Sequence, residues 1–572
     1  MFFGREGFNQ ARFRRDIVGI GKKVPLAGGG YTTYVNLDNA ASTPVLRPVL
    51  DKVIEYMDWY SSVHRGTGFK SQVSTHVYDE AHKVVGGFVK ADMETNAVIF
   101  VKNATEAVNK LSYKLGLGKG DMVLTTMMEH HSNDLPWRSK AATVYAGVDR
   151  RGALDLDDLE TKLRQYGSRI KLVSVSGASN VTGFKNDVGS IAAIAHRAGV
   201  PILVDGAQLV PHSPVDVKPD DHPEHIDYLV FSAHKMYAPF GTGVLIGPKR
   251  TFLTGAPEYA GGGTVNIVTP ETVEWAGLPD REEAGSPNVV GAVALAAAVQ
   301  YLQRQGMRNI ENHERAVTSY ALKRLGEVKG LKVYGEADPN RTGNRVGVIT
   351  FNLDGVPHGL VASALAWEGG IAVRNGCFCA QPYMMQLLGL NPQQLSRLIH
   401  KKRTGNLSDI PGMVRASLAA YNNKKDIDRL IECLEKIKAM ARSGELAKRY
   451  VFSRETGAYY PRDVKVDPKE VFKLEKSSPP LAVGCFSFSG KTAGYISYQP
   501  QLLALTSSAP LFRASSFMGI RWAFLSPNTF LRASSTLSFL MAPVASRYAP
   551  SITMLAILLL PSSLAISLAG IW

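Results

Sequence analysis

The chain has 572 residues, of which 45% are hydrophobic and 20% are charged, and its formal net charge is +15. This composition is typical of a globular protein that is long enough for two or more domains. Four cysteines (Cys377, Cys379, Cys433 and Cys485) exclude a disulfide framework and favour a reducing compartment such as the cytoplasm. No basic run alternates with aromatic residues, so the excess charge predicts a solvated surface and no nucleic-acid partner.

Residues 1–35 are expected to form an N-terminal extension. The first 19 residues contain no apolar core of secretory length. They carry Arg12, Arg14 and Arg15 but also Glu6 and Asp16, so a mitochondrial transit peptide is left open without being favoured.

From residue 36 the pattern alternates between strands and helices. Residues 36–44 (NLDNAASTP) resemble a short strand followed by a turn, and Val45–Tyr60 and Val77–Val89 are expected to be helical. Residues 61–75 between these helices are polar and place His64 and Arg65 beside glycines. This segment is interpreted either as a surface loop or as a loop that lines an anionic pocket.

Ala97–Val101 is predicted to be a buried strand that leads into a helix capped by Asn103 or Thr105. Free N–H groups at such a helix start can bind an anion, and simple capping is the alternative. Later strands have polar residues at their ends: Asp121–Thr125 before His130, Lys171–Ser176 before Asn180, Pro201–Val204 before Asp205 and Gln208, and Tyr228–Phe231 before Ser232, His234 and Lys235.

Helical stretches between these strands, such as Ser190–Ala198, indicate a mainly parallel sheet. Ligands bind outside the carboxyl ends of such strands, so Asn180, Asp205, Gln208, His234 and Lys235 are predicted to lie on one rim. His130 is interpreted either as a structural histidine or as a ring on which a planar cofactor stacks.

The rim carries the groups that pyridoxal 5'-phosphate (PLP) needs. A desolvated lysine can form a Schiff base, and Lys235 by itself is equally a loop lysine that reaches solvent. A carboxylate keeps the pyridine nitrogen of PLP protonated, and Asp205 on a nearby strand end can do this. Asn180 or Gln208 could bond the ring hydroxyl, while Ser232 and the helix end at Thr105 could hold the phosphate. The combination predicts a PLP site.

The segments NATEAVN, MEHHSNDLPW, GASNVTG, VDGAQ and FSAHKMYAPFGTGVLIG resemble class V PLP enzymes of the aminotransferase fold, and in particular group II cysteine desulfurases (selenocysteine lyase-like), over Asn36–Tyr421. The resemblance implies an α/β protein of PLP-dependent transferase fold type I. It implies a large domain with a mainly parallel sheet (36–305) and a small α+β C-terminal domain with the catalytic cysteine loop (306–445).

The same resemblance implies roles for individual residues. Lys235 would be the Schiff-base lysine, Asp205 would pair with the pyridine nitrogen, and His130 would stack on the ring. The other cofactor contacts implied are Gln208 at the ring hydroxyl, Ala104, Thr105, Ser232 and His234 around the phosphate, and Asn180 near the ring and the substrate carboxylate.

Ser286 in EEAGSPNVVGAVAL is implied to reach the phosphate of a neighbouring subunit, which implies a homodimer with shared active sites. The alternative is that Gly285–Pro287 only begins the helix Val289–Leu302.

Beyond Gly306, strands near Lys332–Tyr334 and Val346–Phe351 and helices Val361–Glu368 and Asp426–Met440 are expected, with Cys433 as a packing residue.

Cys379, which precedes Ala380, resembles the nucleophilic cysteine of the family, and Arg374 would help to activate it. Cys377 is interpreted as a second sulfur-accepting thiol, a disulfide partner or a packing residue. A metal site is not expected, because no second pair of ligands is visible.

Arg415 in VRASLAAYNN resembles the bidentate substrate-carboxylate clamp, with a surface salt-bridge arginine as the alternative. Residues 386–412 depart from the compact desulfurase pattern and carry the basic run His400–Arg403, which leaves the sulfur acceptor open.

Residues 446–572 are expected to be a disordered or poorly packed tail, with Tyr450–Glu475 loop-like. Tyr548–Trp572 contains no charged residue and is long enough for a membrane span, although Pro561 and several serines weaken that reading. A C-terminal anchor, a disordered tail and a wrongly predicted end of the coding sequence are the alternatives.

The predicted function is the conversion of L-cysteine to L-alanine, with an enzyme persulfide passed to a sulfur-acceptor protein, as in iron–sulfur cluster assembly. One alternative is another class V activity (aminotransferase, epimerase or β-lyase) in which Cys379 takes no part. Another is a non-catalytic, PLP-holding or membrane-tethered scaffold.

Overall fold

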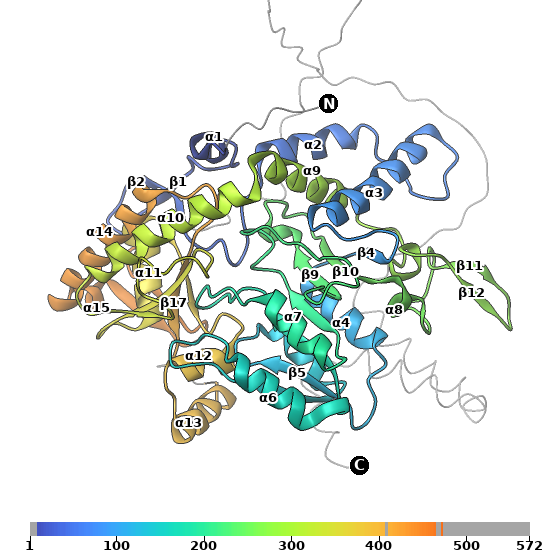
Figure 1. Ribbon diagram of the computed structural model, residues 1–572. Helices are drawn as coiled ribbons and strands as arrows, with labels where there is room; N and C mark the ends of the chain where they lie inside the picture. The colour runs from blue at the N-terminus through green and yellow to red at the C-terminus, as the bar shows by residue number, and fades with distance from the viewer. Residues whose placement is uncertain (1–7, 406–409, 465–470, 473–572) are drawn as a thin grey trace, which may run out of the picture. The chain divides into compact units, whose positions relative to one another are not determined.

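The computed structural model describes residues 8–405, 410–464 and 471–472 (Figure 1). The predictions for Tyr548–Trp572, for Cys485 and for the first seven residues therefore lie outside the described residues. No helix in the described part of the chain is long and apolar enough to cross a membrane.

A seven-stranded sheet forms the centre of the protein, in the order β4-β10-β9-β8-β7-β5-β6. Its strands are β4 (Asn96–Val101), β5 (Met122–Thr126), β6 (Ala142–Ala146), β7 (Ile170–Ser176), β8 (Ile202–Asp205), β9 (Tyr228–Ser232) and β10 (Gly243–Pro248). Every neighbouring pair is parallel except those made by β10, which runs antiparallel to both β4 and β9. The expectation of a mainly parallel sheet is confirmed.

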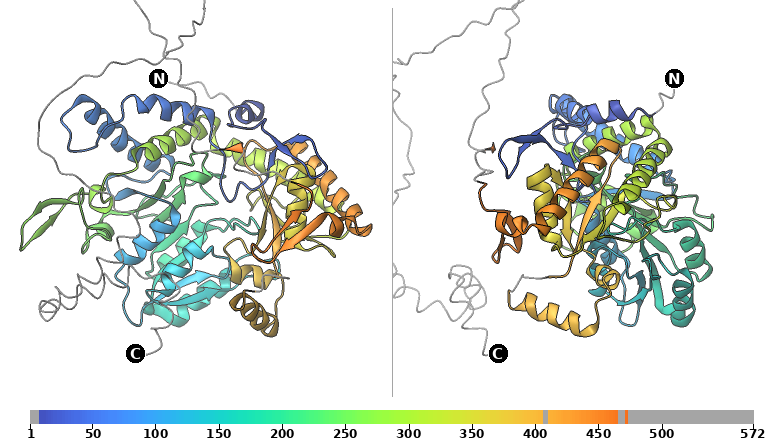
Figure 2. Two further views of the ribbon diagram at one scale, coloured as in Figure 1. Left: turned by 180° about the vertical axis from the view of Figure 1, so that it is seen from behind. Right: turned by 90° about the vertical axis from the view of Figure 1, so that its left-hand side faces the viewer.

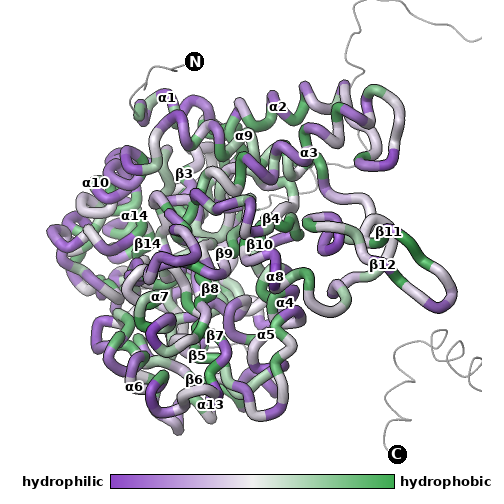
Figure 3. The backbone as a smooth tube through the Cα atoms, turned by 45° about the vertical axis from the view of Figure 1, so that its right-hand side comes forward, coloured by the Kyte–Doolittle hydropathy of each residue, from purple (hydrophilic) through white to green (hydrophobic). Residues whose placement is uncertain are grey.

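Helices cover both faces of this sheet, which explains why its strands are apolar throughout. In β9, Leu229 and Phe231 pack into one core cluster, while Tyr228 and Val230 pack into another on the opposite face. The helices around the sheet are α2 (Arg47–Met57), α3 (Phe69–Phe88), α4 (Ala104–Lys114), α5 (Leu135–Arg138), α6 (Leu156–Tyr166), α7 (Val188–Arg197), α8 (Lys249–Leu253) and α9 (Val289–Gln305). Figure 3 shows the apolar segments gathered in the central strands and hydrophilic segments on the outer helices.

A second, antiparallel sheet has the order β13-β14-β17-β16. Its strands are β13 (Leu331–Tyr334), β14 (Val348–Leu353), β16 (Arg374–Gly376) and β17 (Met413–Ser417). Three helices pack on this sheet and share a separate hydrophobic core with it: α10 (Met307–Gly326), α11 (His358–Gly369) and α14 (Lys424–Arg442). Cys433 is buried in that cluster. This is the expected small α+β unit, and the boundaries 36–305 and 306–445 stay predictions.

Two segments differ from the sequence-based expectation. The helix α3 begins at Phe69, inside the segment 61–75 that was expected to be a loop. Its small polar residues favour a helix here because they are buried and bonded, as in the 2.9 Å hydrogen bond between Tyr56 Oη and Ser74 Oγ. Residues expected to be loop-like form a hairpin of β18 (Tyr450–Ser453) and β19 (Ala458–Pro461). Cross-strand aromatic contacts stabilise it, with the rings of Phe452 and Tyr459 5.1 Å apart.

Several elements of the structure were not predicted from the sequence. Among them are the N-terminal helix α1 (Gln10–Arg15), a hairpin of β11 (Val265–Val268) and β12 (Val273–Trp275), and the helices α12 (Gln381–Leu387) and α13 (Pro392–Arg403). Figure 2 shows the β11–β12 hairpin projecting from the body of the protein. The basic run His400–Arg403 forms the last turn of α13, where positive side chains complement the helix dipole.

Candidate active site

A pocket of about 300 Å³ lies at the carboxyl ends of the parallel strands, between the two sheets. We call it the Lys235 pocket. Its lining includes every predicted site residue except Ser286, namely Ala104, Thr105, His130, Asn180, Asp205, Gln208, Ser232, His234, Lys235, Arg374, Cys379 and Arg415. Ala40, Ala41, Ser132 and Phe378 also line it. Segments that are far apart in the sequence therefore meet here.

Lys235 ends a short 3-10 helix (Ala233–Lys235) that directly follows β9. Burial lowers the pKa of its amine to about 8, and the positive charge of Arg415 acts in the same direction while Asp205 and Cys379 oppose it. The amine is therefore partly neutral near physiological pH, which a nucleophilic lysine requires.

Asp205 is the last residue of β8, the strand next to β9, and Gln208 lies in the turn that follows. The backbone N–H of Ala207 donates to Asp205 Oδ1 at 3.0 Å, and burial raises the pKa of this carboxyl, with Ala207 and Lys235 acting in the opposite direction. Gln208 Nε2 donates to the carbonyl of Ala40 at 2.7 Å. Its Oε1 is buried and has no hydrogen-bond partner among the described residues, which is costly unless a ligand donates to it.

His130 presents a neutral ring to the pocket. The backbone N–H of Ser132 donates to Nδ1 at 3.1 Å, so the neutral ring carries its proton on Nε2. Burial lowers the pKa of His130 to about 3, and the nearby charge of Lys235 acts in the same direction. An uncharged, flat ring in this place can stack on a planar ligand.

The start of α4 gathers hydroxyl and amide groups. The backbone N–H of Ala104 donates to Ser232 Oγ at 2.9 Å, and Thr105 Oγ1 lies 2.7 Å from Ser132 Oγ. Asn103 caps the helix by accepting from the N–H of Glu106. The capping expected from the sequence is confirmed, and anion binding at this helix start stays a prediction. Ser132 also lines the pocket but was not predicted from the sequence. Its position two residues after His130 is the one sequence feature that indicates a place in the site.

The loop that carries Cys379 is held in a constrained conformation. Phe378 and Cys379 have φ values of +53° and +55°, a left-handed region that residues other than glycine rarely adopt. Asn180 Nδ2 donates to the carbonyl of Phe378 at 2.7 Å, and the N–H of His131 donates to that of Cys379 at 2.6 Å. The buried Phe378 ring anchors the loop in an apolar cluster, whereas Cys379 is exposed.

Cys377 is partly buried against the same cluster, and Cys377 and Cys379 are both free thiols. The disulfide alternative is therefore not formed in this structure. Among the described residues no group of three or more His, Cys, Asp or Glu side chains is arranged to hold a metal ion.

Arg415 is only 3% exposed, so the alternative of a surface salt-bridge arginine is wrong. Its Nη1 donates to the carbonyl of Asn180 at 3.0 Å, and its Nη2 donates to Asp38 Oδ1 at 3.3 Å. The ring of Phe378 lies 5.0 Å from the guanidinium. Burial lowers the pKa of Arg415 to about 10, which still leaves it charged at neutral pH.

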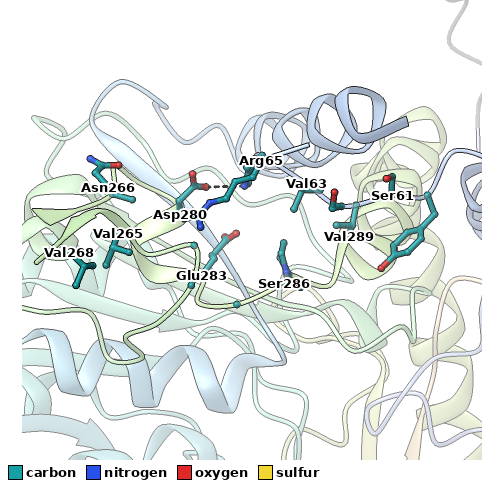
Figure 4. Close-up of a pocket in the computed structure, with 18 residues that line it drawn as sticks. Ser61, Val63, Arg65, Val265, Asn266, Val268, Asp280, Glu283, Ser286 and Val289 are labelled. Atoms are coloured by element: carbon teal, nitrogen blue, oxygen red, sulfur yellow. Dashed lines mark ion pairs between the residues drawn. The ribbon is translucent and has the colours of Figure 1, made fainter. Parts of the chain in front are cut away.

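Ser286 does not line the Lys235 pocket. It lines a larger, open pocket of about 970 Å³, which we call the Ser286 pocket. Figure 4 shows Ser286, Asp280, Glu283 and Arg65 around it. His64 and Arg65 belong to its wall, which favours the pocket-lining reading of their loop, although Asp280 and Glu283 make that wall acidic as well as basic.

A mainly parallel sheet with a lysine and a buried aspartate at adjacent strand ends defines the class of PLP-binding enzymes of the aminotransferase fold. The model of the class-V aminotransferase family matches residues 35–430, and the chain belongs to that family, which is PLP-dependent.

Its relatives include cysteine desulfurases. The chain is 35% identical over 413 residues to a cysteine desulfurase of Haloferax volcanii, which covers 71% of this chain and 89% of the relative. It is 36% identical over 414 residues to a probable cysteine desulfurase of Halalkalibacterium halodurans. That match covers 71% of this chain and 93% of the relative.

Solved structures agree with this placement. An apo cysteine desulfurase from Thermococcus onnurineus superposes with a TM-score of 0.64 at 32% identity, covering 75% of this chain and 97% of that one. The cysteine desulfurase CsdA from Escherichia coli gives a TM-score of 0.63 at 28% identity, and the match covers 76% of this chain and 99% of that one.

Proposed function

We propose that this chain is a PLP-dependent cysteine desulfurase that converts L-cysteine to L-alanine and keeps the sulfur on Cys379 as a persulfide. The observation that carries the proposal is that an exposed thiol, Cys379, and a buried guanidinium, Arg415, share one pocket with Lys235 and Asp205. The first pair fits an amino acid that carries sulfur, and the second pair fits PLP.

The lining of the Lys235 pocket fits PLP in several independent ways. Asp205 supplies a buried carboxylate for a protonated pyridine nitrogen, and the unpartnered Oε1 of Gln208 can accept from the ring hydroxyl. The neutral ring of His130 suits stacking. The hydroxyls of Thr105 and Ser232 at the start of α4 would hold the phosphate, with Ala104 and His234 beside them.

When bound, PLP supplies an electron sink that stabilises negative charge on the substrate's carbon atoms. Arg415 and Arg374 would hold the substrate carboxylate, with Asn180 beside them. Nζ of Lys235 would give and take protons, which its pKa of about 8 allows.

Cys379 would act as its thiolate. Its Sγ forms an S–S bond with the sulfur of the substrate while the substrate's C–S bond breaks and the electron pair stays on carbon. A proton then completes L-alanine, and the enzyme retains the transferred sulfur as the persulfide. Because Cys379 is exposed, the persulfide can be passed on to an acceptor protein, such as a protein of iron–sulfur cluster assembly. Cys377 is a candidate relay for that transfer.

We also propose a homodimer in which Ser286 reaches the phosphate site of the neighbouring subunit. Two observations support it: Ser286 lies in an open pocket away from Lys235, and the adjoining β11–β12 hairpin exposes apolar side chains. Ile267 and Val268 on that hairpin are 57% and 60% exposed, as expected of an uncovered interface.

A single-turnover assay with L-cysteine tests the reaction. Wild type should yield one L-alanine per active site and a persulfide that a reductant releases as sulfide. Cys379→Ala should yield neither while keeping the cofactor's visible absorption. Cys433→Ala is the matched control, because Cys433 is buried in the small domain. Full activity of Cys379→Ala would favour another class V reaction, and bound cofactor without turnover of any amino acid would favour a scaffold.

A further inference from the structure

The turn that carries Lys235 is held by a segment from the N-terminal part of the chain. The carbonyl of His234, just before the lysine, accepts hydrogen bonds from the backbone N–H of Thr43 at 2.9 Å and from Thr43 Oγ1 at 3.2 Å. The N–H of Tyr237, two residues after the lysine, donates to the same Oγ1 at 2.7 Å. One hydroxyl group thus joins the peptide groups on both sides of Lys235.

This turn needs support because its backbone is unfavourable. Tyr237 has a φ of +63°, in the left-handed region that residues other than glycine rarely adopt. Such a conformation persists only where the surrounding contacts determine it. The ring of Tyr237 is buried, and its Oη accepts from the N–H of Ala420 at 3.1 Å. The hydroxyl of Thr43 adds a contact to the main chain of Tyr237 itself.

Thr43 does not belong to the wall of the Lys235 pocket. It is only 3% exposed, and the lining of the pocket includes Ala40 and Ala41 but not Thr43. Its hydroxyl contacts the turn that carries Lys235, so it acts on the pocket through that turn. The alternative is a buried threonine that only satisfies its hydrogen bonds, and this alternative predicts an effect on stability alone.

We propose that Thr43 is a positioning residue for Lys235: its hydroxyl fixes the direction in which the lysine side chain leaves the turn and so aligns Nζ with the cofactor. This rests on the proposed function, because it takes Lys235 as the lysine that binds PLP. The amine of Lys235 joins PLP by condensing with the aldehyde of the cofactor, and one water is released. That step is fast only when the two groups are aligned.

The uptake of PLP by the apoenzyme, followed by visible absorption, tests this alignment without any turnover. Thr43→Val removes the hydroxyl and keeps the shape of the side chain, whereas Thr43→Ser keeps the hydroxyl and loses a methyl group. Thr43→Ala removes the hydroxyl without placing a methyl group against the two peptide groups, so it serves if Thr43→Val does not fold. Thr318→Val is the matched control, because it removes a buried hydroxyl that donates to the carbonyl of Glu314 in α10 at 2.7 Å.

In Thr43→Val and Thr43→Ala the rate of PLP uptake should fall about tenfold across neutral and mildly alkaline pH, because a reacting group is misaligned. The pH midpoint of uptake should stay at the wild-type value, since the amine remains buried. The ratio of visible circular dichroism to absorption should also fall, because it reports how the cofactor is held. Thr43→Ser should keep the uptake rate within about twofold of wild type even if its melting temperature drops, because its hydroxyl can still donate and accept. Thr318→Val should change stability alone.

A wild-type uptake rate in folded Thr43→Val or Thr43→Ala would overturn this inference alone, and so would a Thr43→Ser variant that is as slow as Thr43→Val. A Lys235→Ala variant that gains the same visible absorption as wild type would instead overturn the cofactor role of Lys235 in the proposed function, and the inference with it.

Discussion

The main-chain carbonyl of Asn180 accepts a hydrogen bond from the guanidinium of Arg415 at 3.0 Å. The side chain of the same asparagine donates to the carbonyl of Phe378, next to Cys379. One residue in the loop after β7 thus contacts both the group that would bind the substrate carboxylate and the loop of the nucleophile.

Replacing Asn180 should impair the sulfur transfer more than cofactor binding. Asn180→Ala removes the hydrogen bond that restrains the left-handed turn at Phe378 and Cys379, so kcat for L-cysteine should fall about tenfold or more, as expected when a reacting group is misplaced. Steady-state kinetics and the cofactor's absorption measure the two effects separately. Asn309→Ala, which removes a similar side-chain hydrogen bond from α10, is the control. Equal kcat values in the two variants would contradict this role.

Arg415→Lys should lower kcat/KM for L-cysteine by about 100-fold, because an ammonium group cannot reproduce a planar, bidentate contact with a carboxylate. Cofactor absorption should persist. Arg345→Lys provides a matched control, since Arg345 is equally buried but donates to the carbonyls of Thr182 and Val348 away from the pocket. It should lower stability and leave KM near the wild-type value. An unchanged kcat/KM in Arg415→Lys would remove this arginine from the substrate site.

Cofactor uptake by the apoenzyme should accelerate as the pH rises from 7 to 9. The folded-state pKa of Lys235 is about 8 instead of its ordinary 10.5, so the neutral, nucleophilic amine forms across this range. His130, with a pKa of about 3, should not titrate there. The rise of visible absorption after mixing with PLP measures the rate, with Lys235→Ala as the background. A midpoint near 10.5 would mean that the amine is not desolvated.

Glu129 should make the folded protein more stable in mild acid than at neutral pH. Burial raises its pKa from 4.5 to about 7, against the opposing hydrogen bonds from Ser176, Thr126 and Asn133. The folded state then holds a proton that the unfolded state releases above about pH 4.5. This stabilisation is fully present below pH 4.5 and is lost as the pH rises through about 7.

Denaturant midpoints of wild type and Glu129→Gln at several values between pH 5 and 8 test this, because the neutral amide should flatten the pH dependence. Glu129→Ala should lower the free energy of unfolding by about 2–4 kcal/mol, because it leaves several buried hydrogen-bond donors without a partner. Parallel pH profiles for wild type and Glu129→Gln would show that Glu129 is ionised throughout.

The rim of the parallel sheet was predictable from the sequence. Apolar runs that end in polar residues locate the strands, and parallel strands bring their carboxyl ends to one edge. This is why Asp205, Gln208 and Lys235 line the same pocket as expected. Some elements were not predicted from the sequence, such as the hairpin at Tyr450–Pro461. This hairpin depends on packing against α11, where Ser363 Oγ donates to the carbonyl of Tyr459.

What the sequence determined by itself was local: the strand ends, the helix starts and the residue types suited to PLP, because propensity and periodicity act over a few neighbouring residues. The tertiary structure alone decided which distant groups meet. Asp38 contacts arginines 336 and 377 residues further along the chain. Arg415 is buried at the wall of the Lys235 pocket, and Ser286 lines a different pocket. Such contacts follow from how the two sheets and the N-terminal segment pack together, and no local pattern in the sequence encodes them.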